Sequence, residues 1–345
     1  MSNPESVIKP IDRDSLATPQ SIFGISRFIP KSFYQDKLTI LMYHGVVRQA
    51  LPVPDYCFIT ETQFRQQMEY LARRCRVVSL SEALHRLRSG SFDRPTVAIT
   101  FDDGYQNVFD VAFPVLREFQ FPATVFLNTG FVGTSKTVWF CRLLEAIART
   151  SNRTLEWRDL KFDLSTVNGK ATASKKLQAC LKKLDHDDLL RQVDEIIEKL
   201  GCDSSVPDLS PDFRIMNREA IAIMANSGLI QFGAHTASHS ILTKIPLNKA
   251  LKEIDESTQS IAMWTGQACR LFAYPNGGSG DYDSNILSIL KRLGIVAAVT
   301  TIQGPNTVHT PVLELRRYGI HPGLTRLAFQ FKVHHVLYRS NTQAG

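Results

Sequence analysis

Short apolar segments alternate with amphipathic ones along most of this 345-residue chain, and this alternation limits the possible folds more than any other feature. Apolar runs typical of buried strands lie at residues 38–43, 76–80, 97–101, 123–127, 230–234, 271–274 and 296–300. Helical periodicity lies between them, at residues 60–73, 81–88, 108–119, 217–225, 248–264 and 284–293. Strands that alternate with helices of this length form parallel sheets. About seven such units predict an α/β fold, a closed or nearly closed (β/α) barrel.

Three polar residues mark where helices are expected to begin. Thr60, Ser81 and Asn217 each precede a helical pattern, and their side chains can accept a hydrogen bond from an amide of the first turn. Gln63 follows Thr60 by three residues, which strengthens the prediction at that site.

A stretch of different composition, residues 134–214, interrupts the alternation. Its charge content is higher, helical periodicity recurs in it, and two short segments near Trp157 are compatible with a hairpin. We therefore expect a mostly helical insertion within one domain that spans residues 37–328. Trp139 and Trp157 either face a bound sugar or, as is commoner, pack a small core of the insertion.

The two ends of the chain are expected to lie outside this domain. Residues 1–36 are polar and contain several prolines, which is typical of an irregular N-terminal arm. Within the arm, residues 21–30 are amphipathic enough to dock on the domain or on a membrane surface. Residues 329–345 form the expected C-terminal tail, which begins as a helix.

The overall charge is basic, with a net charge of +7 and a pI near 9.1. A basic balance can attract nucleic acid or anionic membrane surfaces. However, the cations are dispersed, and the sequence has no RNA-binding signature, zinc finger or long lysine and arginine run. A nucleic-acid partner is therefore not expected, whereas peripheral membrane contact stays open. The sequence leaves the oligomeric state undetermined.

Cysteine usage and the N-terminal segment bear on the cellular compartment. The six cysteines are scattered, and none forms a Cys-x-x-Cys pair, which argues against a disulfide framework or a thiolate zinc site. Residues 1–30 contain early acids and no continuous apolar region, so they do not resemble a secretory signal. No stretch approaches the roughly 18 apolar residues of a membrane span. We therefore expect a cytoplasmic protein.

Two adjacent carboxylates directly follow one of the predicted strands. Asp102 and Asp103 come after residues 97–101, and Gly104 follows them. A regular strand would send neighbouring side chains to opposite faces, so the glycine predicts a sharp turn at which both carboxylates can converge. Acids at the carboxyl end of a buried strand are where α/β enzymes place their chemistry.

Two histidines follow another predicted strand. His235 and His239 come after residues 230–234, and their spacing of four places them on one face if the segment makes a helical turn. Two imidazoles and one carboxylate commonly bind zinc or another divalent transition metal. Since the chain has nine histidines, one such pair has little weight alone. Its combination with the carboxylates predicts a metal site.

A third motif combines an arginine with a short strand and a turn. Arg270 precedes residues 271–274, and a Pro-Asn-Gly-Gly turn follows. Arginine is always cationic and grips a carboxylate with two hydrogen bonds. Arg270 is therefore a candidate partner of Asp102; the alternative is a surface arginine at the start of a strand.

In type, spacing and order, these three motifs resemble those of the polysaccharide deacetylases of carbohydrate esterase family 4, the NodB-homology group. Residues 100–105 are similar to its Thr-Phe-Asp-Asp-Gly motif, residues 235–239 to its His-Ser/Thr-x-x-His motif, and residues 270–275 to its Arg-x-x-x-Tyr-Pro motif. The resemblance covers about residues 38–325 and implies a distorted (β/α)7-type barrel.

The resemblance also implies roles for individual residues. Asp103, His235 and His239 would bind the metal, and Asp102 would be the general base. In addition, the backbone N–H of Tyr274 would help to stabilise the oxyanion. Arg270 would tether Asp102.

The histidine that acts as general acid lies near the C-terminus in most of the family, but this chain differs. Its first predicted strand, residues 38–43, ends at His44 and Gly45, as in circularly permuted members in which this strand comes first. We assign the acid to His44, with His321 as the alternative. The family's Asp-x-x-Asp-Trp segment has no clear counterpart, so Arg317 or a backbone carbonyl is left to orient the acid.

The expected activity is metal-dependent removal of N-acetyl groups from amino sugars of a bacterial polysaccharide, oligosaccharide or lipid-linked precursor. The expected partner is thus an N-acetylated glycan. Zinc is the expected metal, with cobalt and nickel as alternatives, because all three accept imidazole and carboxylate ligands. Two other possibilities stay open: an O-acetyl esterase or other amidohydrolase on the same scaffold, and a non-catalytic glycan-binding protein.

Overall fold

The computed structural model describes residues 30–90, 92–203 and 210–335. Most of the predicted N-terminal arm, including residues 21–29, and residues 336–345 of the predicted tail therefore lie outside the described residues. Within the described ranges, each predicted strand of the barrel forms. They are β1 (Leu38–Tyr43), β4 (Arg76–Val78), β5 (Thr96–Phe101), β6 (Ala123–Leu127), β9 (Ile230–Ala234), β10 (Leu271–Ala273) and β11 (Ala297–Val299).

These strands form one parallel sheet, together with the short β12 (Tyr318–Gly319). The strand order is β11-β10-β9-β6-β5-β1-β12, and β4 pairs with the first half of β5. A separate parallel pair, β2 (Gly45–Val47) and β3 (Phe58–Thr60), follows β1. The parallel arrangement confirms the α/β class.

One segment of chain joins the two edges of the main sheet. Leu315 pairs in parallel with Val299 of β11, and its amide donates to the carbonyl of Ala298 at 3.0 Å. A few residues later, the amide of Ile320 donates to the carbonyl of Met42 in β1, also at 3.0 Å. The sheet therefore closes on itself, which confirms the predicted distorted (β/α)7-type barrel.

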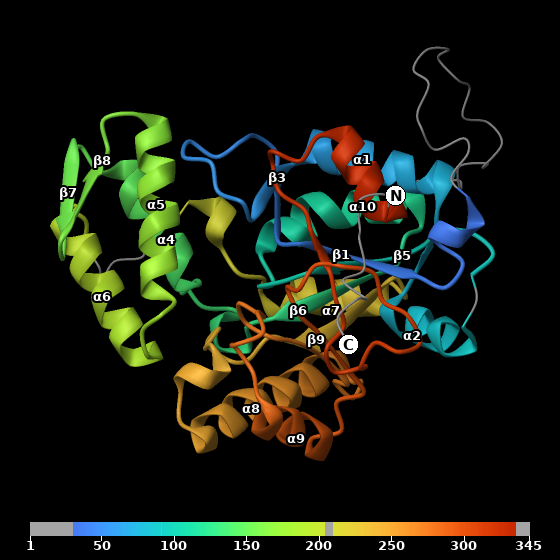
Figure 1. Ribbon diagram of the computed structural model, residues 1–345. Helices are drawn as coiled ribbons and strands as arrows, with labels where there is room; N and C mark the ends of the chain where they lie inside the picture. The colour runs from blue at the N-terminus through green and yellow to red at the C-terminus, as the bar shows by residue number, and fades with distance from the viewer. Residues whose placement is uncertain (1–29, 91, 204–209, 336–345) are drawn as a thin grey trace, which may run out of the picture.

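Helices surround this barrel, with α8 and α9 on one side and α1 and α10 on the opposite side (Figure 1). Their bounds agree with the predicted pattern to within a few residues. The helices of the barrel region are α1 (Glu61–Arg74), α2 (Leu80–Ser89), α3 (Phe113–Phe119), α7 (Arg218–Asn226), α8 (Leu247–Thr265), α9 (Ser284–Arg292) and α10 (Arg326–His334). A π-helical turn (Val108–Ala112) precedes α3, and short 3₁₀ turns lie at Lys31–Phe33, Thr129–Phe131, Pro211–Phe213 and Leu242–Lys244.

Two of the three predicted helix caps are confirmed. The side chains of Thr60 and Asn217 accept hydrogen bonds from the first turns of α1 and α7. The prediction at Ser81 is wrong, because α2 already begins at Leu80. Its cap is Ser79, whose hydroxyl accepts a hydrogen bond from the amide of Glu82 at 3.1 Å.

Side chains of each strand alternate between the barrel interior and the surrounding helices. In β1, Leu38 and Ile40 belong to the interior cluster, whereas Leu41 and Tyr43 pack outward. Helix α2 packs Leu84 and other apolar side chains against this interior cluster, which also contains the first residues of several strands. Apolar side chains thus fill the barrel interior up to the last strand residues, such as Ala273 and Val299, and polar residues follow directly after β1, β5 and β9.

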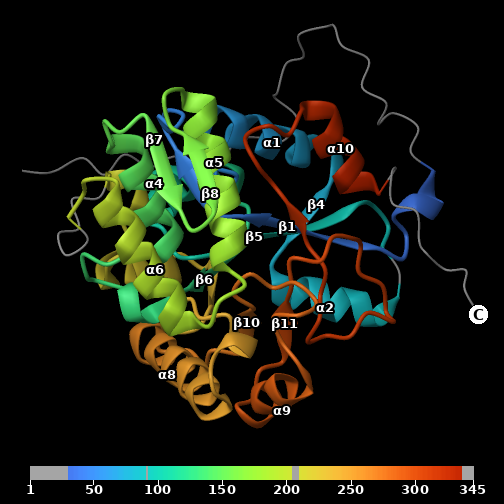
Figure 2. The same cartoon turned by 60° about the vertical axis from the view of Figure 1, so that its left-hand side comes forward.

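The predicted insertion forms a lobe beside the barrel (Figures 1 and 2). It contains α4 (Trp139–Arg149), the antiparallel hairpin β7 (Thr154–Trp157) and β8 (Leu160–Asp163), α5 (Val167–Leu181) and α6 (His186–Lys199). Trp139 and Trp157 are 4% and 1% exposed, and the Trp157 indole N–H donates to Gln192 at 3.0 Å. Both tryptophans therefore pack the insertion core, and the alternative that they face a sugar is wrong.

Helix α10 crosses the predicted boundary between domain and tail at residue 328. Its end is held by buried contacts, since the Tyr70 hydroxyl lies 2.7 Å from His334 Nε2 and the Thr39 hydroxyl lies 3.1 Å from His335 Nε2. The start of the predicted tail is thus packed onto β1 and α1. Among the helices of the described residues, none is both long and apolar enough to cross a membrane.

Gly233 of β9 offers a test of the interior packing. A Cβ atom at this position would lie 2.5 Å from Cε1 of Phe126 and 2.9 Å from the carbonyl oxygen of Leu271, inside the barrel. We expect Gly233→Ala to lower the free energy of unfolding by about 1–3 kcal/mol. Gly280→Ala is the matched control, because nothing lies within 4 Å of its Cβ position, and it should change stability by less than about 0.5 kcal/mol. Equal denaturant midpoints for the two variants would contradict this account.

Candidate active site

The predicted site residues follow three strands that end at the same rim of the barrel. His44 follows β1, Asp102 and Asp103 follow β5, and His235 follows β9. Strand pairing places Tyr43 opposite Phe101, so His44 and Asp102 leave the sheet at the same level. Because parallel strands share their carboxyl ends, side chains more than a hundred residues apart in sequence meet at this rim.

A left-handed turn brings both aspartates into the site. The amide of Asp102 still donates to the carbonyl of Tyr43 at 2.9 Å, which continues the sheet. Asp103 then has φ 70° and Gly104 φ 74°, so the chain leaves the strand and the alternation of side chains ends. A Cβ at Gly104 would also lie 2.6 Å from a Leu127 methyl carbon. The predicted sharp turn is therefore confirmed.

The two histidines converge by a different route from the one expected. Thr236 and His239 have φ values of 63° and 58°, so the segment is a loop, and the helical turn that would place both histidines on one face does not form. The carbonyl of His235 accepts a hydrogen bond from the Asn128 side chain at 2.6 Å, which fixes the start of this loop. The left-handed residues turn the chain back, and the two imidazole centroids lie 5.1 Å apart.

Asp103, His235 and His239 form the cluster suited to a metal. The Nε2 atoms of His235 and His239 lie 3.6 Å and 3.4 Å from Oδ1 of Asp103, and one ligand atom from each residue lies within 4.8 Å of the others. His235 Nδ1 lies 2.7 Å from the carbonyl oxygen of Ala273, which leaves Nε2 free as a ligand. These separations are those of donors around one ion with bonds of about 2.0–2.2 Å.

Burial supports this assignment. The three residues are only 1–7% exposed, and within the described residues neither carboxylate oxygen of Asp103 has a hydrogen-bond partner. Burial, and then the charge of Asp102, raise the pKa of Asp103 to about 8 when only the protein's own groups act on it. A buried acid without partners is costly to ionise, and a divalent cation between these donors would remove that cost. The residues therefore fit a metal.

A buried arginine stabilises the ionised form of Asp102. Arg317 Nη1 and Nη2 donate to its two carboxylate oxygens, both at 2.7 Å, and Nε donates to the Thr300 carbonyl at 2.8 Å. Arg317 is fully buried. Burial alone would raise the pKa of Asp102, but the charge and hydrogen bonds of Arg317, together with His235 and His44, outweigh burial and lower this pKa to about 2. Asp102 is thus a carboxylate in which each oxygen keeps a further acceptor position.

The predicted role of Arg270 is wrong. Arg270 precedes β10, so it lies at the amino end of that strand, whereas Asp102 lies at a carboxyl end. Its side chain is exposed and lines a shallow pocket with residues such as Gln231 and Thr265. Arg317 takes the tether role instead. From the sequence, Arg317 is a candidate only for orienting the acid histidine, because an arginine before a two-residue strand carries no signal of its partner.

Tyr274 does not have a free backbone N–H. That N–H donates to the Val299 carbonyl at 3.2 Å, as part of the pairing between β10 and β11. Its side chain is buried, donates to the Leu313 carbonyl at 2.8 Å and stacks on Tyr282 with centroids 4.2 Å apart. The predicted role of this N–H in oxyanion stabilisation is therefore not supported, and the Tyr274 side chain belongs to the hydrophobic core.

Of the two acid candidates, His44 lies in the site. Burial lowers its pKa to about 4; the charge of Asp102 opposes this effect, and Arg317 and His235 add to it. Among the described residues, His44 Nδ1 has no hydrogen-bond partner, so nothing takes the place of the family's missing aspartate. His321 is exposed, and its carbonyl accepts a hydrogen bond from Gln63 outside this cluster.

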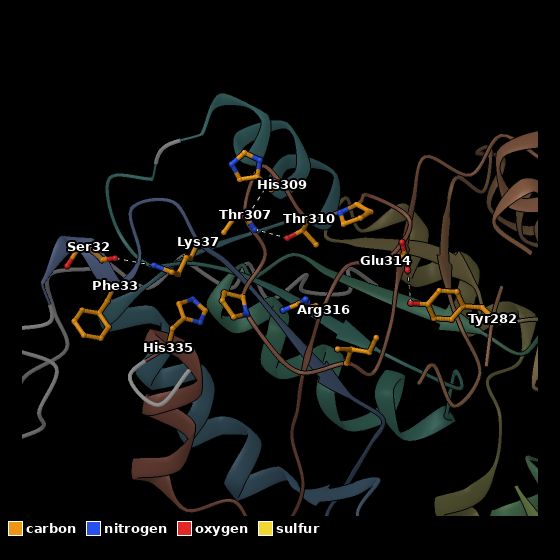
Figure 3. A pocket seen from close by; sticks show the side chains of 13 residues that line it. Ser32, Phe33, Lys37, Tyr282, Thr307, His309, Thr310, Glu314, Arg316 and His335 are labelled. Atoms are coloured by element: carbon orange, nitrogen blue, oxygen red, sulfur yellow. Dashed lines mark hydrogen bonds between the residues drawn. The ribbon is translucent and has the colours of Figure 1, made fainter. Parts of the chain in front are cut away.

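A cavity of about 750 Å³ lies elsewhere, at the amino end of β1 (Figure 3). Lys37, Arg316 and Glu314 line it, together with Tyr282, which donates to Glu314 at 3.0 Å. None of the predicted site residues contributes to its lining. Donor chemistry, and not cavity size, therefore identifies the candidate active site.

The metal assignment predicts the behaviour of single variants. The wild-type protein should bind one equivalent of Zn²⁺, and Asp103→Asn and His239→Ala should each lower the affinity more than about 100-fold, since they remove direct ligands. Competition with a chelating dye measures both affinities. His321→Ala is the control and should match the wild type. Unchanged zinc affinity in Asp103→Asn would refute this ligand set.

Curated relatives match a limited part of the chain. A stretch of 78 residues is 36% identical to the poly-β-1,6-N-acetyl-D-glucosamine N-deacetylase of Staphylococcus epidermidis, and it covers 22% of this chain and 27% of that protein. A stretch of 76 residues is 33% identical to the protein of the same name from Staphylococcus aureus strain MSSA476, over 22% and 26%. The chain thus matches about a quarter of these relatives' length.

Solved structures share the fold over most of the chain. IcaB from Ammonifex degensii has a TM-score of 0.56 at 20% identity, over 87% of this chain and 98% of that chain. The Streptococcus pyogenes deacetylase PplD, solved in complex with acetate, has a TM-score of 0.54 at 18% identity, over 87% and 99%. The family model described as polysaccharide deacetylase matches residues 89–298, well over half of the sequence. The chain therefore belongs to the polysaccharide deacetylase family.

Proposed function

We propose that this protein is a metal-dependent deacetylase that hydrolyses N-acetyl groups on amino sugars of a bacterial polysaccharide, an oligosaccharide or its lipid-linked precursor. One observation carries the proposal: the buried cluster of Asp103, His235 and His239 lies beside Asp102, a carboxylate that Arg317 keeps ionised. The staphylococcal relatives are poly-β-1,6-N-acetyl-D-glucosamine N-deacetylases, which supports an N-acetylated glycan as the substrate.

Zinc is the metal that we assign to the cluster. Two imidazoles and one carboxylate leave open positions in a zinc site, and cobalt or nickel would accept the same donors. When bound, such an ion supplies Lewis acidity for the acetyl carbonyl and acidifies a water molecule. The remaining steps fall to side chains of this chain.

Asp102 is assigned as the general base. Its carboxylate takes a proton from the water that attacks the acetyl carbon, and each oxygen has an acceptor position that Arg317 does not use. The low pKa that Arg317 imposes ensures that the base is ionised at neutral pH. A carboxylate with a low pKa is a weak base. The position of Asp102 next to Asp103 compensates for this weakness, because the proton of the attacking water moves only a short distance to it.

His44 is assigned as the general acid. The C–N bond of the amide breaks as acetate forms, and the amine nitrogen must receive a proton to leave. His44 lies level with Asp102 on the neighbouring strand. Burial favours the neutral imidazole, but the charge of Asp102 opposes burial and favours the protonated form, which donates to the amine. Water thus gives its oxygen to acetate and one proton to Asp102, while His44 gives a proton to the amine. Proton exchange with solvent then returns both side chains to their starting states.

The same proposal includes the cytoplasm as the site of action. All six cysteines are unpaired, and four of them are buried, as is usual in a reducing compartment. A cytoplasmic enzyme would act on a precursor or an oligosaccharide before export. Labelling of thiols in intact and permeabilised cells would test the location.

Replacement of the base should separate catalysis from metal binding. We expect Asp102→Asn to reduce acetate release from an N-acetylated oligosaccharide by about 10²–10⁴-fold, because the amide cannot accept the proton, while one equivalent of zinc stays bound. Acetate is measured enzymatically and zinc by elemental analysis. Since Arg317 then lacks its partner, thermal melting must show a folded protein. Release at the wild-type rate would eliminate Asp102 as the base.

Two histidine variants should distinguish the acids. His44→Ala should slow release from the N-acetyl substrate by about 10²–10⁴-fold, whereas His321→Ala should match the wild type. With 4-nitrophenyl acetate the His44 variant should lose far less activity, because nitrophenolate leaves without a proton. A dead His321 variant beside an active His44 variant would reverse the assignment.

A further inference from the structure

The metal-binding cluster is buried, and more exposed side chains lie between it and solvent. Because Asp103 and its two histidine partners are 1–7% exposed, an acetyl group must approach them past more exposed neighbours. Among the described residues near the cluster, His44 and Lys182 are partly exposed, and Tyr56 is 47% exposed. Tyr56 and Lys182 are therefore candidates to border the approach to the cluster, next to His44.

Tyr56 presents an aromatic ring next to the proposed acid. Its ring lies edge-on to the His44 imidazole, with centroids 6.3 Å apart and an interplanar angle of 85°. The neighbours Asp55 and Cys57 are buried, and the Cys57 amide donates to Oδ1 of Asp55 at 2.9 Å. The exposed tyrosine is thus held by a fixed backbone and does not lie on a loose loop.

Lys182, which belongs to the insertion, lies beside Tyr56. It follows α5 directly, its Nζ lies 3.4 Å from the Tyr56 hydroxyl, and it lies 5.8 Å from the ring centroid. The ammonium group therefore lies beside the aromatic ring that contacts the proposed acid.

A buried contact fixes the insertion to the loop that carries Tyr56. Gln178 of α5 donates to Oδ2 of Asp55 at 3.2 Å, and its side chain is 3% exposed. Lys182 lies one helical turn after Gln178, so this contact sets Lys182 opposite Tyr56. The insertion lobe beside the barrel thus supplies part of the approach (Figure 2).

We propose that Tyr56 and Lys182 form a binding subsite for the sugar ring that carries or adjoins the reacting N-acetyl group. The proposal rests on the deacetylase function proposed above. The exposed phenol ring offers an apolar face on which a pyranose can stack. The ammonium group and the phenol hydroxyl can both donate to sugar hydroxyls. The insertion is therefore a determinant of substrate binding as well as a structural addition.

Binding of a defined glycan tests the subsite. The probe is a β-1,6-linked N-acetylglucosamine pentasaccharide, titrated calorimetrically into the full-length, zinc-loaded Asp102→Asn protein so that turnover does not interfere. In this background we expect Tyr56→Ala and Lys182→Met each to raise Kd about tenfold, and Tyr56→Phe to raise it less because stacking remains. Lys183→Met is the matched control, since Lys183 is exposed one residue further on.

Steady-state kinetics with the natural Asp102 give a second measure. Both substitutions should raise KM for the pentasaccharide about tenfold and change kcat less than about threefold, as a binding role requires. Unchanged Kd and KM in Tyr56→Ala and Lys182→Met, with melting temperatures equal to that of the parent protein, would overturn the subsite. Failure of the parent protein to bind the pentasaccharide would also overturn it. Binding that weakens as expected, without any acetate release by the wild type, would uphold the subsite and refute the deacetylase function.

Discussion

The buried pair of Arg317 and Asp102 is the interaction on which the site depends most. Arg317 precedes β12, Asp102 follows β5, and the guanidinium also binds the carbonyl of Thr300 after β11. One side chain therefore connects three strands across the closed barrel. Burial of two charges is favourable only when geometry and hydrogen bonds compensate desolvation, and here the pair is bidentate and fully buried. Closure of the barrel and ionisation of the base thus rely on the same contact.

Unusual backbone conformations gather where the proposed ligands leave their strands. Asp103, Thr236 and His239 all have positive φ without being glycine, and such residues cost on the order of 1–3 kcal/mol each. Hydrogen bonds hold the start of each turn, since the Asp102 amide donates to the Tyr43 carbonyl and the His235 carbonyl accepts from the Asn128 side chain. These conformations allow the side chains of the site to converge, whereas strand geometry alone would send Asp102 and Asp103 to opposite faces. The turns therefore convert two ordinary strand ends into one cluster of donors.

In the proposed enzyme, the barrel and the insertion have separate tasks. The barrel supplies the metal-binding cluster, the base and the acid from β1, β5 and β9. Through Lys182 and the contact of Gln178 with Asp55, the insertion supplies the approach that the rest of the glycan would contact. Such a division would let binding preferences change through the insertion without disturbance of the buried chemistry, since site chemistry and fold are separable in this class of proteins.

Much of the molecule could be predicted from sequence because local patterns specify it. Apolar runs and helical periodicity identified the strands and helices, and short motifs identified Asp102, Asp103, His235, His239 and His44. Long-range geometry decided the rest. The direction of β10 puts Arg270 at the wrong end of the barrel, and the closing segment brings Arg317 to Asp102. Pairing of β10 with β11 occupies the Tyr274 amide, and packing of α5 brings Lys182 to Tyr56. A sequence determines which elements form because those preferences are local, whereas strand order, register and closure decide which distant side chains meet.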